Sequence, residues 1–336
     1  MKIAYLIYAH THPEQLARMI AALDDPCVDF FIHIDKKVDI RPFLQFMNRS
    51  ANIHVLKKRI KVFWMGYSMV EATLAMMRDA VRYSEEIGEP FKYYVLLSGQ
   101  DYPIKSNQRI LDFFERSEGT EYMLYWKLSE FWDPWMHKIE KYHNLDSSLT
   151  NQRCSGRYGW RSYRMIHKTL HRIVSKREYL QGLIAYGGSS WWMLTQNAVE
   201  YVLNYVATNR KFVNFYRFTE APDEMFFHSI ILNSPFADRV INYSGYHELL
   251  EKWKNIIKKC TSDLLRYEAG KSIILDHHSF NFRYIDWDPG RERPAILKDD
   301  DYNALRESEC LYARKMHPVK SGRLLEKIDK NLRMIA

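Results

Sequence analysis

Strand-like and helix-like segments alternate along the first 126 residues, and this alternation restricts the fold more than any other feature. Runs rich in aliphatic, β-branched or aromatic residues predict strands at 3–8, 30–34, 53–56, 93–97 and 122–126. Apolar residues at helical spacing predict helices between them, at 13–23, 68–84 and 107–114. Strands that alternate with helices pair in parallel through crossover connections. We therefore expect an α/β fold with a mostly parallel central sheet and flanking helices.

Polar residues follow three of these predicted strands. His10 comes after the first strand, Asp35 after the second, and Gln100 and Asp101 after the fourth. Ligands of open α/β sheets bind at the carboxyl ends of the strands, so these side chains form the predicted binding rim. His10 and His12 are also the residue types of a metal site, but we expect them to line a pocket.

Two segments in the second half of the chain carry candidate chemistry. The run 187–194 opens with two glycines and predicts a tight turn that leads into a hydrophobic strand. The segment 222–232 begins with a proline and predicts an apolar helix, with Glu220, Asp223 and Glu224 around its start. A carboxylate there either favours the helix N-terminus or serves as a general base. The spacing leaves both roles open.

The pattern loosens between 127 and about 180 into an aromatic and basic stretch. Strand and helix patterns resume at 190–208, and a strand-like run at 273–285 precedes a basic helix at the end of the chain. No internal repeat or low-complexity linker interrupts the sequence. We expect one continuous domain of 336 residues.

Charge and cysteine usage limit the partners and the compartment. The net charge of +8 is compatible with nucleic acid, an anionic membrane surface or a phosphate-bearing substrate. The four cysteines lie far apart without a CxxC pair, which indicates reduced thiols and no zinc site. We expect neither a signal peptide nor a membrane-spanning helix. A cytoplasmic protein, with peripheral contact to the inner face of an anionic membrane, is the resulting expectation.

No glycine-rich phosphate loop is present, so a diphosphate would need protein cations or a metal ion. Asp286 and Asp288 form a literal Asp-x-Asp, the carboxylate pattern that holds a divalent cation in many sugar-nucleotide transferases. Arg283, Arg314 and Lys315 stand in apolar surroundings and are the candidate cations. Solvated surface side chains remain the alternative for each of these groups.

Seven segments in order resemble the core-2/I-branching β-1,6-N-acetylglucosaminyltransferase family, which also includes the peptide O-xylosyltransferases. They lie at 31–37, 64–74, 94–105, 188–192, 221–224, 283–287 and 311–316. Each segment alone is weakly specific, but seven in the family's order are strongly specific and run through nearly the whole chain. The animal members have a Golgi anchor and many cysteines, whereas we expect no anchor in this chain and count only four cysteines, so it resembles a bacterial, cytosolic relative.

The resemblance implies a GT-A-type glycosyltransferase that inverts the anomeric centre without a metal ion or other cofactor. It implies that Glu224 is the catalytic base and that Arg283 and Lys315, with Arg314 beside them, bind the donor diphosphate. It places Asp35 on the nucleotide-binding side of the site. His10, Gln100 and Asp101 are expected beside it.

The expected partners are a UDP-sugar and a glycan or polysaccharide acceptor, bound by 1–126 and 127–336 respectively. N-acetylglucosamine is the first choice of donor sugar and xylose the second. Ser190 and the aromatic rings of Trp191, Trp132 and Trp160 are the candidates for acceptor binding, whereas Trp192 is expected in the core. Two alternatives stay open: a metal-dependent transferase that uses Asp286 and Asp288, and a nucleic-acid-binding protein, which the scattered basic residues disfavour.

Overall fold

A six-stranded sheet forms the centre of the protein. The computed structural model describes residues 1–47, 52–131, 133–147, 165, 169, 173–241, 251, 280–288 and 290–334. The sheet has the order β3-β2-β1-β4-β7-β6. Its strands are β1 (Ile3–Ala9), β2 (Val28–Ile34), β3 (Ile53–Val55), β4 (Tyr93–Ser98), β6 (Tyr122–Lys127) and β7 (Tyr186–Thr195). The first four are parallel, and β7 runs antiparallel to β4 and β6. The expected α/β fold is confirmed, with a mixed rather than purely parallel sheet.

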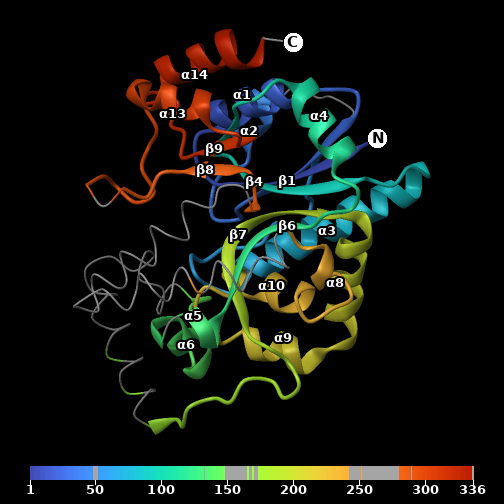
Figure 1. The fold of residues 1–336 in the computed structure, drawn as a ribbon, viewed down its shortest axis with the longest axis vertical. Helices are drawn as coiled ribbons and strands as arrows, with labels where there is room; N and C mark the ends of the chain where they lie inside the picture. Colours follow the sequence, from blue (N-terminus) through green and yellow to red (C-terminus); the bar gives the residue numbers. More distant parts are fainter. Residues whose placement is uncertain are drawn as a thin grey trace.

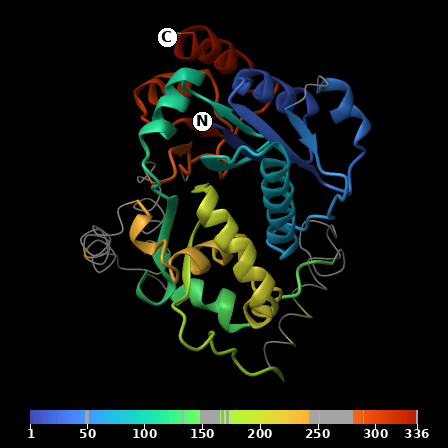
Figure 2. The same cartoon turned by 90° about the vertical axis from the view of Figure 1, so that its right-hand side faces the viewer.

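Helices cover both faces of this sheet (Figure 1). One layer holds α1 (Pro13–Leu23), α2 (Arg41–Phe46), α4 (Asn107–Arg116), α13 (Tyr302–Glu307) and α14 (Gly322–Ile328). The other layer holds α3 (Ser68–Ile87), α8 (Gln196–Thr208), α9 (Arg210–Tyr216) and α10 (Phe226–Ile231), with α5 (Leu128–Phe131) and α6 (Asp133–Glu140) nearby. The two layers remain separate when the molecule is turned (Figure 2).

Strand alternation divides the hydrophobic core between the two layers. In β1, Tyr5 and Ile7 join the cluster that contains α1 and α14, whereas Ala4 and Leu6 join the cluster that contains α3 and α8. Successive side chains of a strand point to opposite faces, so one apolar strand serves both cores. This explains why the predicted strands are almost continuously hydrophobic.

A small second sheet brings the end of the chain to the centre. It has the order β5-β9-β8 and consists of β5 (Asp101–Pro103), β9 (Tyr312–Arg314) and β8 (Arg283–Ile285). In its register, Asp101 pairs with Arg314. Residues that are more than two hundred positions apart therefore meet just beyond the end of β4.

The predicted glycine turn at 187–188 is wrong, because both glycines lie inside β7. A Cβ atom on Gly188 would lie 1.8 Å from the Leu124 carbonyl oxygen and 2.6 Å from His228 Nε2. Glycine is therefore required for the close approach of β6 and α10, not for a turn.

The predicted helix at 222–232 is two elements. A 3₁₀ turn, η1 (Pro222–Glu224), precedes α10, and Met225 at φ −138° separates them. Because α10 begins only at Phe226, the carboxylates of Glu220, Asp223 and Glu224 lie before its first turn. None of them caps α10 through a side-chain hydrogen bond.

Candidate functional site

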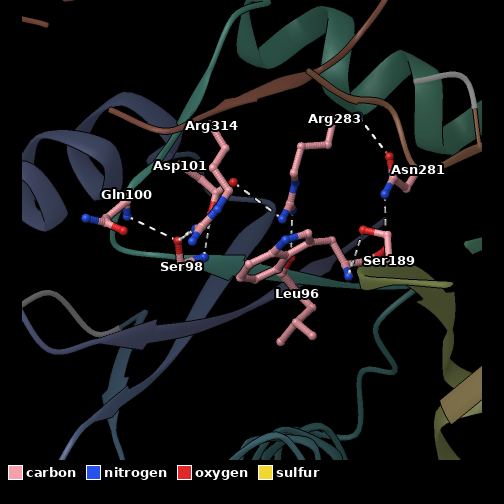
Figure 3. Close-up of polar contacts among 9 residues, drawn as sticks. Leu96, Ser98, Gln100, Asp101, Ser189, Asn281, Arg283 and Arg314 are labelled. Atoms are coloured by element: carbon pink, nitrogen blue, oxygen red, sulfur yellow. Dashed lines mark hydrogen bonds and ion pairs between the residues drawn. The ribbon is translucent and has the colours of Figure 1, made fainter. Parts of the chain in front are cut away.

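The polar strand ends converge with β9 at one edge of the sheet. Asp101 is fully buried and its Oδ2 accepts hydrogen bonds from Ser98 N and Ser98 Oγ, both at 2.7 Å. Arg314 donates to Ser98 Oγ and lies 3.5 Å from Asp101 Oδ2 (Figure 3). The backbone of Gln100 joins this network: its N donates to Ser98 Oγ at 3.2 Å, and its carbonyl accepts from Met316 N at 2.8 Å. Asp101 thus anchors the cationic segment 314–316 against the end of β4.

Arg283 lies on the other side of Asp101 and is buried. Its side chain is 1% exposed, with Nη1 3.4 Å from Asp101 Oδ1 and Nη2 donating to the Leu96 carbonyl at 2.7 Å (Figure 3). Burial lowers the pKa of Arg283 to about 10, and Asp101 opposes this shift. The guanidinium is paired with protein groups, so in this position Arg283 stabilises the site by holding Asp101 and the end of β4 together. Contact with a diphosphate, the predicted role, would require it to leave these partners.

Trp191 joins the two arginines. Its ring lies 4.5 Å from the guanidinium carbon of Arg283 and 4.7 Å from that of Arg314. Such contacts are attractive because the face of the ring carries negative charge. Trp192 is fully buried, as expected. The arginines therefore cover part of the Trp191 ring, and that part is not accessible to a sugar. This restricts the predicted role of Trp191 in acceptor binding.

Of the three candidate cations, Arg314 and Lys315 are more exposed than Arg283. The Arg314 side chain is 17% exposed, and burial lowers its pKa while Asp101 raises it. Lys315 is half-buried and lies next to Arg314 on the same segment. These two residues fit the predicted diphosphate-binding role better than the fully enclosed Arg283.

His10 and Asp35 lie on the same edge, at the ends of β1 and β2. Asp35 Oδ1 accepts from Lys37 N at 2.9 Å and from Val62 N at 3.3 Å, so it holds the loop after β3. His10 is exposed, yet desolvation lowers its pKa, Asp35 raises it, and Arg314 lowers it again. Asp35 N donates to the Ala9 carbonyl at 2.9 Å, which holds the ends of β1 and β2 side by side.

The three carboxylates around η1 have different environments. Glu224 is 31% exposed, and its Oε2 accepts from Lys138 Nζ at 2.8 Å. Asp223 is buried and accepts from Ser190 Oγ at 2.8 Å. Glu220 lies 3.4 Å from His143 Nδ1. Glu224 is therefore the most exposed of the three carboxylates, and Lys138 holds its orientation.

Burial shifts the pKa values of Asp223 and Glu220. Burial and then the neighbouring Glu224 raise the pKa of Asp223 to about 7, whereas the hydrogen bond from Ser190 lowers it. Burial also raises the pKa of Glu220, and Lys138 opposes this.

The Asp-x-Asp at 286–288 is engaged within the protein. Asp286 Oδ2 pairs with Arg291, and Asp286 Oδ1 accepts from the backbone N of Asp288 at 2.8 Å. Asp288 Oδ1 accepts from Gly290 N at 2.8 Å. Within the described ranges, no three His, Cys, Asp or Glu side chains form a group that could hold a metal ion. The motif builds a local turn, and the expectation of metal independence stays a prediction.

Some residues of the site could not be predicted from the sequence, and some predicted residues lie outside the part of the chain that the structure describes. Lys138 and the Ser190–Asp223 hydrogen bond carried no signal in the sequence, because neither has a characteristic spacing. Trp132 and Trp160 lie outside the described residues, as do Cys154 and Cys260. Cys27 and Cys310 are free thiols, and burial raises the pKa of Cys310 to about 11.

Comparison with known proteins decides the family. The model of the Core-2/I-branching enzyme family matches residues 3–306. The chain belongs to the Core-2/I-branching enzyme family. The family that the seven sequence segments indicated is thereby confirmed.

Curated relatives of this family member include the xylosyltransferases. Xylosyltransferase 1 of Canis lupus familiaris is 28% identical over 249 residues, which is 72% of this chain and 23% of that protein. Xylosyltransferase 2 of the same species is 26% identical over 276 residues, 77% of this chain and 29% of that protein. The chain thus spans about a quarter of the length of these relatives.

A solved structure, the apo form of mouse xyloside xylosyltransferase 1, also matches. It covers 70% of this chain and 83% of its own at 12% identity, with a TM-score of 0.25. The fold described above rests on the topology of this chain itself. Across the parts of the chain that the structure describes, no helix is both long and apolar enough to cross a membrane.

Proposed function

We propose that this chain is an inverting glycosyltransferase that moves a sugar from a UDP-sugar to a hydroxyl of a glycan or polysaccharide. The observation that carries the proposal is that neighbouring residues of β7 touch both halves of a displacement site. Trp191 contacts the cationic cluster of Arg283 and Arg314, and Ser190 contacts Asp223, the residue before Glu224. Cations for a leaving diphosphate and a base for an incoming hydroxyl are the two requirements of a single displacement.

The proposed mechanism assigns the base to Glu224. Lys138 holds Oε2, which leaves Oε1 to accept the proton of the acceptor hydroxyl as that oxygen attacks C1 of the donor sugar. The bond from C1 to the UDP oxygen breaks as the new glycosidic bond forms, so the configuration at C1 inverts. Arg314 and Lys315 would stabilise the charge that grows on the departing UDP without a metal ion.

The donor and the cellular site belong to the same proposal. The curated relatives are named xylosyltransferases, which favours xylose over the N-acetylglucosamine that the sequence motifs placed first. The proposed site of action is the cytoplasm, and the net charge of +8 supports contact of the protein with an anionic membrane surface there.

The test uses water as the acceptor, because the glycan is not identified. Release of UDP from UDP-xylose and from UDP-N-acetylglucosamine is measured for the wild type and for Glu224→Gln, with UDP affinity measured by calorimetry. We expect the variant to lose about 10²–10⁴-fold in rate while UDP affinity stays unchanged, because the amide cannot take the proton. Glu200→Gln, on the exposed side of α8, is the matched control. Turnover of Glu224→Gln at the wild-type rate would remove Glu224 as the base.

A further inference from the structure

A pocket of about 400 Å³ lies beside the proposed catalytic segment and has no role in the mechanism above. It opens between the loop after β3, the start of α3 and the end of α9. Its wall combines charged and aromatic side chains, among them Lys61, Phe63, Glu71, Asp146, Arg217 and Phe218. A cavity of this size holds a small ligand such as a sugar ring.

Backbone contacts place this pocket between the two halves of the site. Val62 N donates to Asp35, which ties the pocket loop to the rim at the end of β2. Ala221 N donates to the Met65 carbonyl at 2.9 Å, and the Tyr67 ring lies 5.9 Å from that of Phe226. The pocket wall is therefore attached directly to the segment that carries Glu224.

Asp146 contributes a carboxylate to the wall of the pocket and binds the start of α3. Its Oδ1 accepts from Ser68 N at 3.1 Å and from Ser68 Oγ at 2.6 Å. A Cβ atom on Gly66 would lie 2.2 Å from the same oxygen, so a larger residue at this position would displace the carboxylate from Ser68. The turn before α3 is thus shaped around a carboxylate, as expected of a preformed site.

The remaining polar groups of the pocket are available to a ligand. Within the described part of the chain, no hydrogen bond or ion pair joins the side chains of Lys61, Glu71 and Arg217 to the protein. Arg217 only lies over the Tyr67 ring, at 5.6 Å from its centroid. Burial raises the pKa of Glu71, which Arg217 opposes. Two cations face two carboxylates here, so the pocket has no net preference for an anion.

Saccharides match this combination of groups. Their hydroxyls both donate to carboxylates and accept from Arg and Lys, and their C–H faces pack on aromatic rings. The Phe218 side chain offers such a face, since it is 43% exposed at the pocket. A nucleotide phosphate would instead require a cluster of cations without the carboxylates.

We propose that this pocket binds a sugar ring of the acceptor glycan, beyond the ring whose hydroxyl reacts. The proposal rests on the proposed glycosyltransferase function. In a single displacement the base and the acceptor lie on one side of C1 and the diphosphate on the other. The pocket wall is attached to the segment that carries Glu224 by the bond from Ala221 N to the Met65 carbonyl, whereas Arg314 is attached to Ser98 at the end of β4. We therefore assign the ring in the pocket to the acceptor, which the proposed base must contact.

The test measures saccharide binding and donor binding separately. Saturation-transfer NMR with UDP present probes the methyl β-glycosides of xylose, galactose and N-acetylglucosamine at millimolar concentration. The variants are Phe218→Leu, which keeps the bulk but removes the flat face, and Arg217→Gln. We expect Phe218→Leu to weaken binding of a bound glycoside about two- to tenfold, the effect of one aromatic face, and Arg217→Gln about tenfold or more, the effect of one charged hydrogen bond. Affinity for UDP should stay unchanged.

Matched controls come from exposed residues away from the pocket. Phe46→Leu removes a side chain that is 53% exposed, and Arg82→Gln removes an exposed cation of α3. Both should bind the glycosides as the wild type does. Failure of the wild type to bind any probe, or equal binding by the pocket variants and the wild type, would overturn the proposal.

Two further outcomes would distinguish a wrong acceptor assignment from a wrong proposed function. If the pocket variants lose affinity for the UDP-sugars but not for UDP, the pocket holds the donor sugar and the acceptor assignment is overturned. If the wild type binds no UDP, the proposed function fails, whereas glycoside binding that depends on Phe218 would still establish a saccharide site.

Discussion

At the scale of single residues, a buried arginine shapes the candidate site. Arg283 is enclosed by Asp101, the Leu96 carbonyl and the Trp191 ring. An ionised group in such a place is stable only while its partners remain, because removal of one leaves an uncompensated buried charge. Arg283 thus holds Asp101 and Trp191 in place, and these two in turn contact Arg314.

Replacement of Arg283 should destabilise the fold as well as the activity. We expect Arg283→Met to lower the free energy of unfolding by about 3–5 kcal/mol, since Asp101 loses its buried counter-charge. Urea unfolding measures this change. The double variant with Asp101→Asn should lose less than the sum of the single variants, because their charges compensate each other. Additive losses would show that the pair is not coupled.

A glycine in β7 offers a second residue-scale prediction. Gly188→Ala places a Cβ atom 1.8 Å from the Leu124 carbonyl oxygen, and backbone cannot move aside easily. We expect a loss of about 1–3 kcal/mol in the free energy of unfolding, as for other overpacked interiors. Gly322→Ala is the control, because nothing lies within 4 Å of its added Cβ. A melting temperature of Gly188→Ala equal to that of the wild type would contradict this account of the glycine.

At the scale of elements, one buried carboxyl joins β6 to the start of α8. Glu121 is fully buried and accepts from Thr195 N at 2.8 Å and from Thr195 Oγ1 at 2.5 Å. The same Thr195 hydroxyl accepts from Ala198 N and so caps α8. Burial raises the pKa of Glu121 to about 7, and the hydrogen bonds from Thr195 oppose this.

This raised pKa predicts how stability depends on pH. The folded protein binds the Glu121 proton more tightly than the unfolded chain, whose carboxyl has its ordinary pKa of 4.5. The stabilising contribution is therefore complete below that pKa and is lost as pH rises through about 7. We expect Glu121→Gln, which resembles the protonated form, to weaken this decline in urea unfolding between about pH 5 and pH 8. Parallel curves for both proteins would contradict the assignment.

At the scale of the whole molecule, strands from the C-terminal part of the chain pair with strands from the N-terminal part. The small sheet β5-β9-β8 carries the C-terminal cations to the end of β4, and β7 inserts between β4 and β6. Both 1–126 and 127–336 thus contribute strands to one central sheet. The division into a nucleotide half and an acceptor half stays a prediction, and it does not correspond to two separate sheets, since the strands of both halves interleave.

The whole-molecule prediction concerns metal ions. Because Arg314 and Lys315 can carry the charge of a leaving diphosphate, we expect donor turnover to be unchanged by EDTA. The measurement is UDP release from UDP-xylose and UDP-N-acetylglucosamine, with and without the chelator. A strict requirement for Mn²⁺ would instead favour the alternative in which Asp286 and Asp288 hold a metal, and their bonds to Arg291 and Gly290 would then have to open.

Local patterns were sufficient to predict most elements. The expected helix at 13–23 coincides with α1, and the expected strand at 93–97 ends one residue before β4 does. The strand β5 was missed because three residues, one of them proline, are too short to show periodicity. The glycine pair at 187–188 was misassigned because a turn and a close approach require the same residue.

By itself, the sequence determined the order of strands and helices, the family and the candidate residues of the site. It did so because alternation of apolar residues is a local property, and because seven motifs in one order rarely arise by chance. Only the tertiary structure decided which candidates meet. Arg314 lies near Asp101 across 213 positions, and the same packing buries Arg283 while leaving Glu224 open to solvent. Burial and long-range contacts belong to the folded chain as a whole, so no local pattern contains them.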